Sequence, residues 1–324
     1  MVHLSLLAMA AMWGSNFVAI KQLLRTLDPL EVVLLRLTLA SLCFAVVLLA
    51  SAGSLPRFSR AEWRRLAVIG VLGITINTTG VAFGTRMIPA ALASLIVTTN
   101  PVFTALLARG LLGEPLTRRK LLGIAVAFAG VLLVLLYGGP EAHFDLHNAL
   151  GVLVMLLGPS AWALYTVFSK PFLARCPPTQ FAGIVVLIGT LPLLPVLLVE
   201  HRIVGQVAHF GALDWLATLE TAGLALVVAY TIWYRGLRVL SPTQLAVYNY
   251  LVPVFGVLGA WVFLGERITI FLLLGGLTIL TGVVLTNSGR GGRGLAPVQA
   301  THAGGGGEAE HESERAALGE PGAS

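Results

Sequence analysis

Two ionisable side chains lie inside apolar stretches of this sequence, where a charge needs a partner or a function. Arg36 and Glu220 each stand about six residues into such a stretch, roughly 9 Å below the membrane surface if the stretches are transmembrane helices. At equal depth the two could pair, or Arg36 could receive a substrate carboxylate while Glu220 carries a coupling proton. The simpler alternative is that both side chains extend to the outer surface.

Aromatic and amide side chains share helical faces in two other apolar stretches. Trp13 and Asn16 are spaced i and i+3, and so are Trp162 and Tyr165, so each pair lies on one face of a helix. Such a mixed face is typical of a binding cavity, although aromatic residues also gather at membrane interfaces.

Two proline residues stand in the middle of apolar stretches. Pro101 and Pro253 would each remove one backbone hydrogen bond and free a carbonyl group four residues earlier. Polar residues precede both prolines, and they serve either helix packing alone or substrate binding near the membrane centre. The predicted substrate-binding residues are Trp13, Asn16, Arg36, Asn77, Thr78, Thr98, Asn100, Trp162, Tyr165, Tyr230, Tyr248 and Asn249, with Glu220 as the coupling candidate.

Motifs for catalysis or metal binding are not found. The sequence contains no HExxH motif, no P-loop and no paired acids within the apolar stretches, so we expect neither an enzyme nor an ATP-driven pump. His143, Asp145 and His147 could hold a metal, but such spacing in a polar loop usually means solvated side chains. Cys43 and Cys176 lie on different elements and suggest no disulfide. We therefore expect no catalytic residue, no metal and no cofactor.

The elements that must position these residues are transmembrane helices. The chain of 324 residues is 56% hydrophobic and 11% charged, against roughly a quarter charged in soluble proteins. Apolar stretches of nearly 20 residues indicate helices, because barrel strands would be about half as long. Ten spans are predicted: 4–23, 30–51, 65–86, 90–112, 118–138, 148–170, 180–200, 214–236, 242–264 and 268–288.

The sequence repeats itself without a gap at an offset of 152 residues. This offset aligns PVF at 101–103 with PVF at 253–255 and LGE at 112–114 with LGE at 264–266. An offset of 149 aligns Trp13 with Trp162 and Lys21 with Lys170. We predict a first repeat over 1–139 and a second over 140–288, each with five helices and therefore of opposite orientation in the membrane.

The distribution of charge agrees with inverted repeats. With both termini in the cytoplasm, fourteen Lys and Arg residues lie in inner loops and five in outer loops, which satisfies the positive-inside rule. The inner set is Arg57, Arg60, Arg64, Arg65, Arg109, Arg118, Arg119, Lys120, Lys170, Arg175, Arg235, Arg238, Arg290 and Arg293. Four of these, Arg109 and residues 118–120, align with uncharged residues in the second repeat. A parallel duplication would have no reason to lose them.

The remaining residues suggest no further folded domain. Residues 289–324 are rich in Gly and Glu and lack apolar periodicity, so we predict a disordered cytoplasmic tail. The net charge of +6 arises from the Lys and Arg residues of the loops between spans, which reflect membrane topology. We therefore expect no nucleic-acid partner. A small-molecule substrate and the lipid bilayer are the expected partners, and the protein is expected to be a monomer.

Several segments resemble the drug/metabolite transporter superfamily, in particular its EamA-type ten-helix exporters. They are WGSNFVAIK from Trp13, PLEVVLLRL from Pro29, PVFTALLARGLLGEPLT from Pro101, SAWALYTVFSK from Ser160 and PVFGVLGAWVFLGERIT from Pro253. The resemblance implies alternating access and export of amino acids or related metabolites. It also implies that Arg36 matches a recurrent arginine and that the helices of Trp13 and Trp162 line a central cavity.

These observations predict a secondary transporter of the plasma (inner) membrane that exports a small amphipathic zwitterion, most simply an amino acid. A nucleotide-sugar or phosphate-ester exchanger of the same fold is the alternative, although it would need more cationic cavity residues than Arg36. A membrane-embedded enzyme or a non-transporting scaffold explains the polar midplane residues less well.

Overall fold

The protein is an all-helical membrane protein. The computed structural model describes residues 2–50, 56–112, 116–137, 146–173, 175–198, 202–239, 245 and 248–287, and these contain no strand. Eight helical stretches are long and apolar enough to cross a membrane, and two shorter apolar helices follow at Val252–Leu264 and Ile270–Thr286. All ten fall on the ten predicted spans, which confirms the predicted fold class. The predicted tail lies outside the described residues.

Five of the spans are largely regular helices. They are α1 (Val2–Leu23), α2 (Pro29–Ala50), α7 (Arg118–Tyr137), α8 (Leu146–Leu173) and α15 (Ile270–Asn287). The seventh span begins as α9 (Pro178–Thr190) and continues as a 3₁₀ segment, η3 (Leu191–Leu198). Pro192 and Pro195 in this segment explain why the predicted single helix tightens. A short helix that the sequence did not predict, α10 (Arg202–Val207), follows.

The other four spans are interrupted. The third consists of α3 (Arg60–Gly70), a π-helical segment η2 (Val71–Ile76) and α4 (Asn77–Met87), and the eighth of α11 (Ala212–Thr218), a π-helical segment η4 (Leu219–Val228) and α12 (Ala229–Val239). The fourth is divided into α5 (Ala90–Val97) and α6 (Asn100–Leu112), and in the ninth α14 (Val252–Leu264) begins after a turn. These interruptions occupy aligned positions at the offset of 152.

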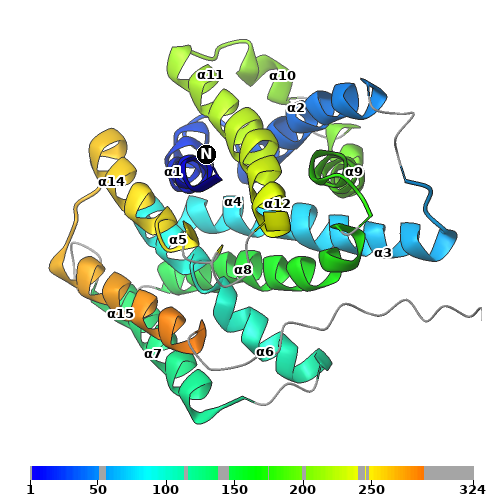
Figure 1. Ribbon diagram of the computed structural model, residues 1–324. Coiled ribbons are helices and arrows are strands. Elements are labelled where there is room, and N and C mark those ends of the chain that lie inside the picture. Colours follow the sequence, from blue (N-terminus) through cyan, green and yellow to red (C-terminus); the bar gives the residue numbers. More distant parts are fainter. Residues whose placement is uncertain are drawn as a thin grey trace, which may run out of the picture. The chain divides into compact units, whose positions relative to one another are not determined.

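The helices pack in a pattern that survives exchange of the two halves. In Figure 1, α1 lies beside α14 and the α11–α12 helix, whereas α8 lies beside α4 and the α5–α6 helix. The first span corresponds to the sixth, the ninth to the fourth and the eighth to the third, so the first set of neighbours corresponds to the second. The pairs α2–α9 and α7–α15 each join two corresponding spans, so exchanging the two halves leaves these pairs unchanged. This packing is what two related halves require, and the boundaries 1–139 and 140–288 stay a prediction.

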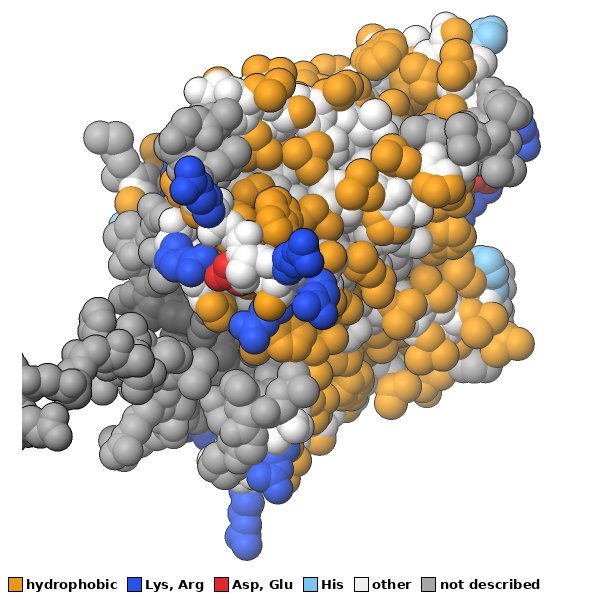
Figure 2. All heavy atoms as spheres, turned by 90° about the vertical axis from the view of Figure 1, so that its right-hand side faces the viewer, with side chains coloured by type: hydrophobic (Ala, Val, Ile, Leu, Met, Phe, Trp, Pro, Cys, Tyr) orange, Lys and Arg blue, Asp and Glu red, His pale blue; other side chains and the backbone are white. Residues whose placement is uncertain are grey.

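Apolar side chains cover much of the outside as well as the interior. Figure 2 shows one face on which hydrophobic side chains predominate and Lys and Arg lie in a few groups. Leu49, Val204 and Phe263 are each about three-quarters exposed, which suits contact with lipid tails. Inside, the buried residues form two hydrophobic clusters, which Trp13 and Leu35 both contact.

Glycine residues allow α7 and α15 to pack with their backbones in contact. A Cβ atom added at Gly282 would lie 2.3 Å from the Ala127 nitrogen, and one at Gly130 would lie 2.7 Å from the Ile279 nitrogen. Small residues at helix contacts of this kind stabilise membrane helix pairs through close packing.

We expect Gly282→Ala to lower the free energy of unfolding by about 1–3 kcal/mol, because the new methyl group must separate two backbones. The melting temperature of the detergent-solubilised protein measures the effect. Gly110→Ala is the matched control, because a Cβ atom there meets nothing within 4 Å. Equal melting temperatures for the two variants would contradict this account of the helix contact.

Candidate functional site

A cavity lies among the helices of both predicted halves. Its volume is about 90 Å³. The lining residues are Trp13, Asn16, Phe17, Arg36, Asn77, Thr78, Val81, Val97, Thr98, Asn100, Pro101, Trp162, Ala225, Leu226, Tyr230, Asn249 and Val252.

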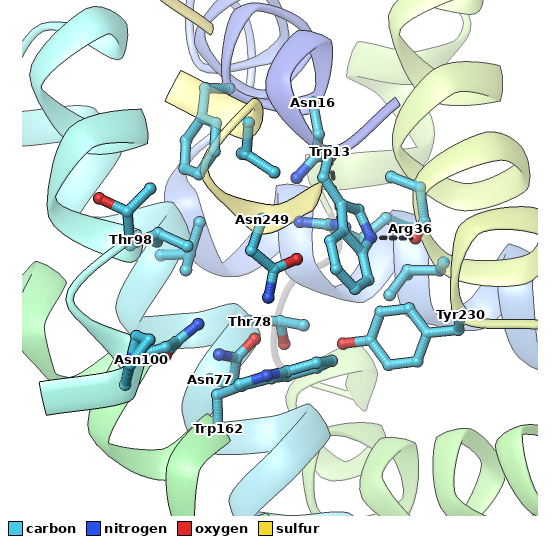
Figure 3. Close-up of a pocket in the computed structure, with 17 residues that line it drawn as sticks. Trp13, Asn16, Arg36, Asn77, Thr78, Thr98, Asn100, Trp162, Tyr230 and Asn249 are labelled. Atoms are coloured by element: carbon cyan, nitrogen blue, oxygen red, sulfur yellow. Dashed lines mark hydrogen bonds between the residues drawn. The ribbon is translucent and has the colours of Figure 1, made fainter. Parts of the chain in front are cut away.

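Ten of the twelve predicted substrate-binding residues line this cavity. They are the ten residues labelled in Figure 3: Trp13, Asn16, Arg36, Asn77, Thr78, Thr98, Asn100, Trp162, Tyr230 and Asn249. In that view the Asn249 side chain is near the centre, with the rings of Trp13 and Tyr230 to its right and that of Trp162 below it, and Asn77 and Asn100 are at the lower left. Side chains from seven spans therefore meet in one place.

Tyr165 and Tyr248 do not line the cavity. The Tyr165 ring is 1% exposed and packs over Gly73, where an added Cβ atom would lie 2.1 Å from its Cδ2 atom. The Tyr248 hydroxyl is hydrogen-bonded to His3 near the start of α1. Of the two prolines, Pro101 lines the cavity and Pro253 does not. The residue before Pro253, Val252, lines it instead.

The π-helical segment η4 anchors two of the lining side chains. Arg36 Nη2 donates to the Thr221 carbonyl at 3.4 Å and to Asn16 Oδ1 at 3.3 Å. Trp13 Nε1 donates to the Ala225 carbonyl at 3.1 Å. Both carbonyl groups belong to η4, and π-helical turns frequently occur at functional sites. No proline marks η2 or η4, so the sequence offered no signal for them beyond their aligned positions.

Three buried polar atoms of the cavity have no hydrogen-bond partner among the described residues. They are Nε of Arg36, which is a donor, and Oδ1 of Asn100 and of Asn249, which are acceptors. Buried polar groups are usually satisfied, and an unmade hydrogen bond is unfavourable. The cavity is therefore able to accept a ligand that carries both acceptor and donor groups.

Aromatic rings form part of the cavity wall. The ring centroids of Trp13 and Trp162 are 5.6 Å apart, those of Trp162 and Tyr230 are 5.4 Å apart, and both pairs meet edge to face. Trp233 and Tyr234 extend this cluster away from the cavity. Both are buried.

The fourth and ninth spans break where polar residues precede the prolines. In the fourth span, Thr98 and Thr99 form a turn whose N–H groups donate to the carbonyls of Leu95 and Ile96. In the ninth, the Leu251 N–H donates to the Tyr248 carbonyl in the same way. Each proline then stands in the first turn of the next helix, where its missing N–H has no intrahelical role.

Glu220 lies beside the cavity without lining it. Its Oε1 atom accepts a hydrogen bond from Ser15 Oγ at 2.9 Å, while its buried Oε2 atom has no partner among the described residues. It directly precedes Thr221, whose carbonyl accepts from Arg36. Glu220 is thus one residue away from the group that orients the cavity's arginine.

The structure does not test the metal alternative. His143 and Asp145 lie outside the described residues, and no group of three His, Cys, Asp or Glu residues that could hold a metal occurs within them.

The sequence matches the EamA-like transporter family over residues 1–136 and 149–288. The chain belongs to this family. An "Uncharacterized transporter" of Archaeoglobus fulgidus is 31% identical over 88% of this chain and 97% of its own length. A "Probable terminal-alkyne amino-acid exporter" of Streptantibioticus cattleyicolor is 31% identical over 85% and 89%, and a "Probable amino-acid metabolite efflux pump" of Escherichia coli is 28% identical over 86% and 92%.

Membership of the EamA-like family identifies the chain as a multi-pass membrane transporter with a small-molecule substrate, and it points away from an enzyme. One solved crystal structure has a TM-score of 0.62 with this fold at 20% identity, covering 88% of this chain and 95% of the other. That likeness supports the fold alone.

Gly73→Ala tests how the aromatic wall of this transporter is held. The added methyl group would overlap the Tyr165 ring and push it toward Trp162, 5.1 Å away between centroids. We expect a loss of about 1–3 kcal/mol in stability, measured as a lower melting temperature in detergent. Gly223→Ala in η4 is the control, because its Cβ atom meets only Leu219 Cδ1 at 3.2 Å.

A second substitution makes this test specific. Adding Tyr165→Leu to Gly73→Ala frees the space of the ring, so the double variant should melt at a higher temperature than Gly73→Ala alone. No recovery in the double variant would show that the Gly73–Tyr165 contact is not the cause.

Proposed function

We propose that this transporter exports a small zwitterionic metabolite of the amino-acid class from the cytoplasm by alternating access. One observation carries the proposal: a single small cavity holds an arginine with an unmade donor, two amides with unmade acceptors, and an aromatic wall. An α-amino acid offers the complementary set of a carboxylate, an ammonium group and a side chain.

Arg36 is the proposed carboxylate site. It is the one charged residue among those that line the cavity, and 3% of it is exposed. Two of its contacts are long hydrogen bonds, at 3.3 and 3.4 Å, which leave its Nε atom unpartnered. A carboxylate would make shorter, charge-assisted hydrogen bonds to the guanidinium.

The amides and rings suit the other end of such a substrate. Oδ1 of Asn100 and Oδ1 of Asn249 can accept hydrogen bonds from an ammonium group, and the faces of Trp13 and Trp162 attract cations. The same rings provide apolar surface for the substrate's side chain.

The names of two relatives agree with this substrate class. The protein of Streptantibioticus cattleyicolor is named as an amino-acid exporter and that of Escherichia coli as an amino-acid metabolite efflux pump. A phosphate ester or nucleotide sugar carries more negative charge than the single arginine that lines the cavity would balance.

The distribution of charge supports the proposed orientation in the membrane. The bias of Lys and Arg toward one side of the membrane favours a cytoplasmic position for both termini, and the cytoplasmic (inner) membrane is the proposed location. Under this orientation the α1 end at Leu23 faces outward, and a monomer contains the whole cavity.

Arg36→Gln tests the carboxylate site. We expect counterflow of the transported amino acid in proteoliposomes to fall about 10- to 150-fold, because a hydrogen bond to a charged group is worth about 1.5–3 kcal/mol. Counterflow of the corresponding decarboxylated amine should change little. A merely structural role would reduce both substrates alike.

Arg64→Gln is the matched control for Arg36→Gln. It removes the same charge from an exposed residue that lines neither this cavity nor the second hollow, so transport should remain at the wild-type level. Unchanged amino-acid counterflow in Arg36→Gln would remove Arg36 from the binding site.

Glu220 is the proposed coupling residue, because it is a buried carboxyl group next to the residue that binds Arg36. Glu220→Gln keeps the shape and the contact with Ser15 but cannot carry a proton. We expect it to abolish accumulation driven by a pH gradient while counterflow, which needs no net proton movement, persists.

Ser15→Ala is the control for the coupling test, since it removes the hydrogen bond to Oε1 and leaves the carboxyl group titratable. Gradient-driven accumulation should survive in Ser15→Ala. Accumulation that persists in Glu220→Gln, or loss of counterflow along with accumulation, would contradict the assignment.

A further inference from the structure

The short link between α4 and α5 is held by charged residues from two other spans. Lys21 of α1 donates from Nζ to the carbonyls of Thr85 and Ile88, both at 2.8 Å. Glu266, in the turn after α14, accepts from the backbone N–H groups of Ala90 at 2.8 Å and Ala91 at 3.0 Å. A cation thus meets the C-terminus of one helix and an anion meets the N-terminus of the next, which is the favourable arrangement for both helix dipoles.

A glycine aims Glu266 at this helix end. Gly265 has a φ of 68°, in the left-handed region that residues with a side chain rarely adopt, and it terminates α14. The Glu266 N–H then donates back to the Ala260 carbonyl at 3.2 Å. Glu266 therefore caps α5, a helix of the other predicted half.

These contacts lie at the outer end of helices that also line the cavity. On α1, Asn16 and Phe17 face the cavity, the fully buried Ile20 follows, and Lys21 comes next. On α4, the cavity residues Asn77, Thr78 and Val81 precede Thr85 by one or two turns.

A second hollow lies on the other side of these contacts. It has a volume of about 390 Å³ and is lined by Lys21, Leu24, Arg25, Arg86, Leu264 and Glu266. Lys21 and Glu266 thus border the hollow and fasten the helix ends that separate it from the cavity. Arg86 adds a bond from its guanidinium to the Leu24 carbonyl.

The positive charges here oppose the general trend of the sequence. The outer loops are poor in Lys and Arg, yet Lys21 and Arg86 stand together at this end. Where the two halves align, the second half lost Arg109 and residues 118–120, whereas Lys21, Arg86 and Glu266 align with Lys170, Arg238 and Glu114. Topology explains the lost charges, and it does not explain why these three residue types occur twice.

We propose that Lys21 and Glu266 form the outer gate of the transporter. Their bonds to the α4–α5 link hold α1, α4, α5 and the turn after α14 together, and the substrate leaves the cavity for the outer hollow when these bonds break. The inference rests on the proposed function and on its orientation in the membrane.

Cysteine labelling tests the gate without any substrate. In a variant carrying Cys43→Ser and Cys176→Ala, Val81→Cys places one thiol in the cavity wall. A membrane-impermeant maleimide added outside intact cells should label it slowly. Adding Lys21→Met or Glu266→Gln should raise the labelling rate at least about 10-fold, and combining both should add little, because each breaks the same closure.

Arg267→Gln is the matched control, since it removes a charge from the exposed residue next to Glu266, and its labelling rate should equal that of the parent. Unchanged rates in Lys21→Met and Glu266→Gln would overturn the gate. So would an equal rise in Arg267→Gln, or a rise seen only with inside-out vesicles. Glu266→Asp keeps the charge on a shorter side chain and should give an intermediate rate, which preserves the test if Glu266→Gln does not fold.

Counterflow measured on the parent protein separates the two proposals. Faster labelling of the gate variants in a protein that carries no amino acid would leave the gate standing and reject the proposed substrate. Amino-acid counterflow with unchanged labelling would reject the gate alone.

Discussion

Hydrocarbon offers no hydrogen-bond partner to the backbone, and this constraint determines where the helices of this protein are regular and where they are not. A regular helix satisfies its own backbone, so it can face lipid. A π-helical turn or a break exposes carbonyl or N–H groups, so it must face other parts of the protein. The π-helical segments η2 and η4 and the breaks at 98–99 and 250–251 all belong to spans that line the cavity, whereas the 3₁₀ segment η3 belongs to a span that does not.

The exposed backbone groups have a use there. The carbonyls of Thr221 and Ala225 in η4 fix the side chains of Arg36 and Trp13, and each of those side chains in turn satisfies a backbone acceptor away from water. The cavity therefore owes its geometry to helix irregularity as much as to its side chains. Polar lining residues are tolerated near the membrane centre because most of them already form hydrogen bonds within the protein. Only a few polar atoms remain for a ligand.

Two halves of similar packing nevertheless enclose an unequal cavity. Tyr165 aligns with Asn16, yet Tyr165 fills the space over Gly73 while Asn16 lines the cavity and accepts from Arg36. Arg36 itself aligns with no charged residue, since the offsets of 149 and 152 place Val185 and Ile188 opposite it. The symmetry determines how the helices are arranged. The departures from it make the two sides of the cavity chemically different, so an asymmetric substrate can bind in one orientation.

Periodicity and the internal repeat were enough to predict the ten spans and to bring ten residues to one cavity. Both succeed because lipid fixes the length of each span and because aligned residues in the two halves approach the same axis. The sequence could not predict that Tyr165 turns onto Gly73, since that depends on a contact between two spans. Nor could it predict η2 and η4, whose residues have ordinary helical composition, or the reach of Glu266 across to α5.

The position of the cavity between two hydrophobic clusters bears on how it could open. Trp162, Leu226 and Tyr230 belong to one cluster, and Phe17, Val81 and Val252 belong to the other. Close-packed clusters move as units more readily than they deform. A boundary between two such units is where relative movement disturbs the fewest contacts, and the cavity occupies that boundary. Arg36 is held by η4, and Asn100 follows the break at 98–99. Movement at the boundary would alter the distance between these two residues, so the affinity for a substrate bound to both would differ between the two conformations.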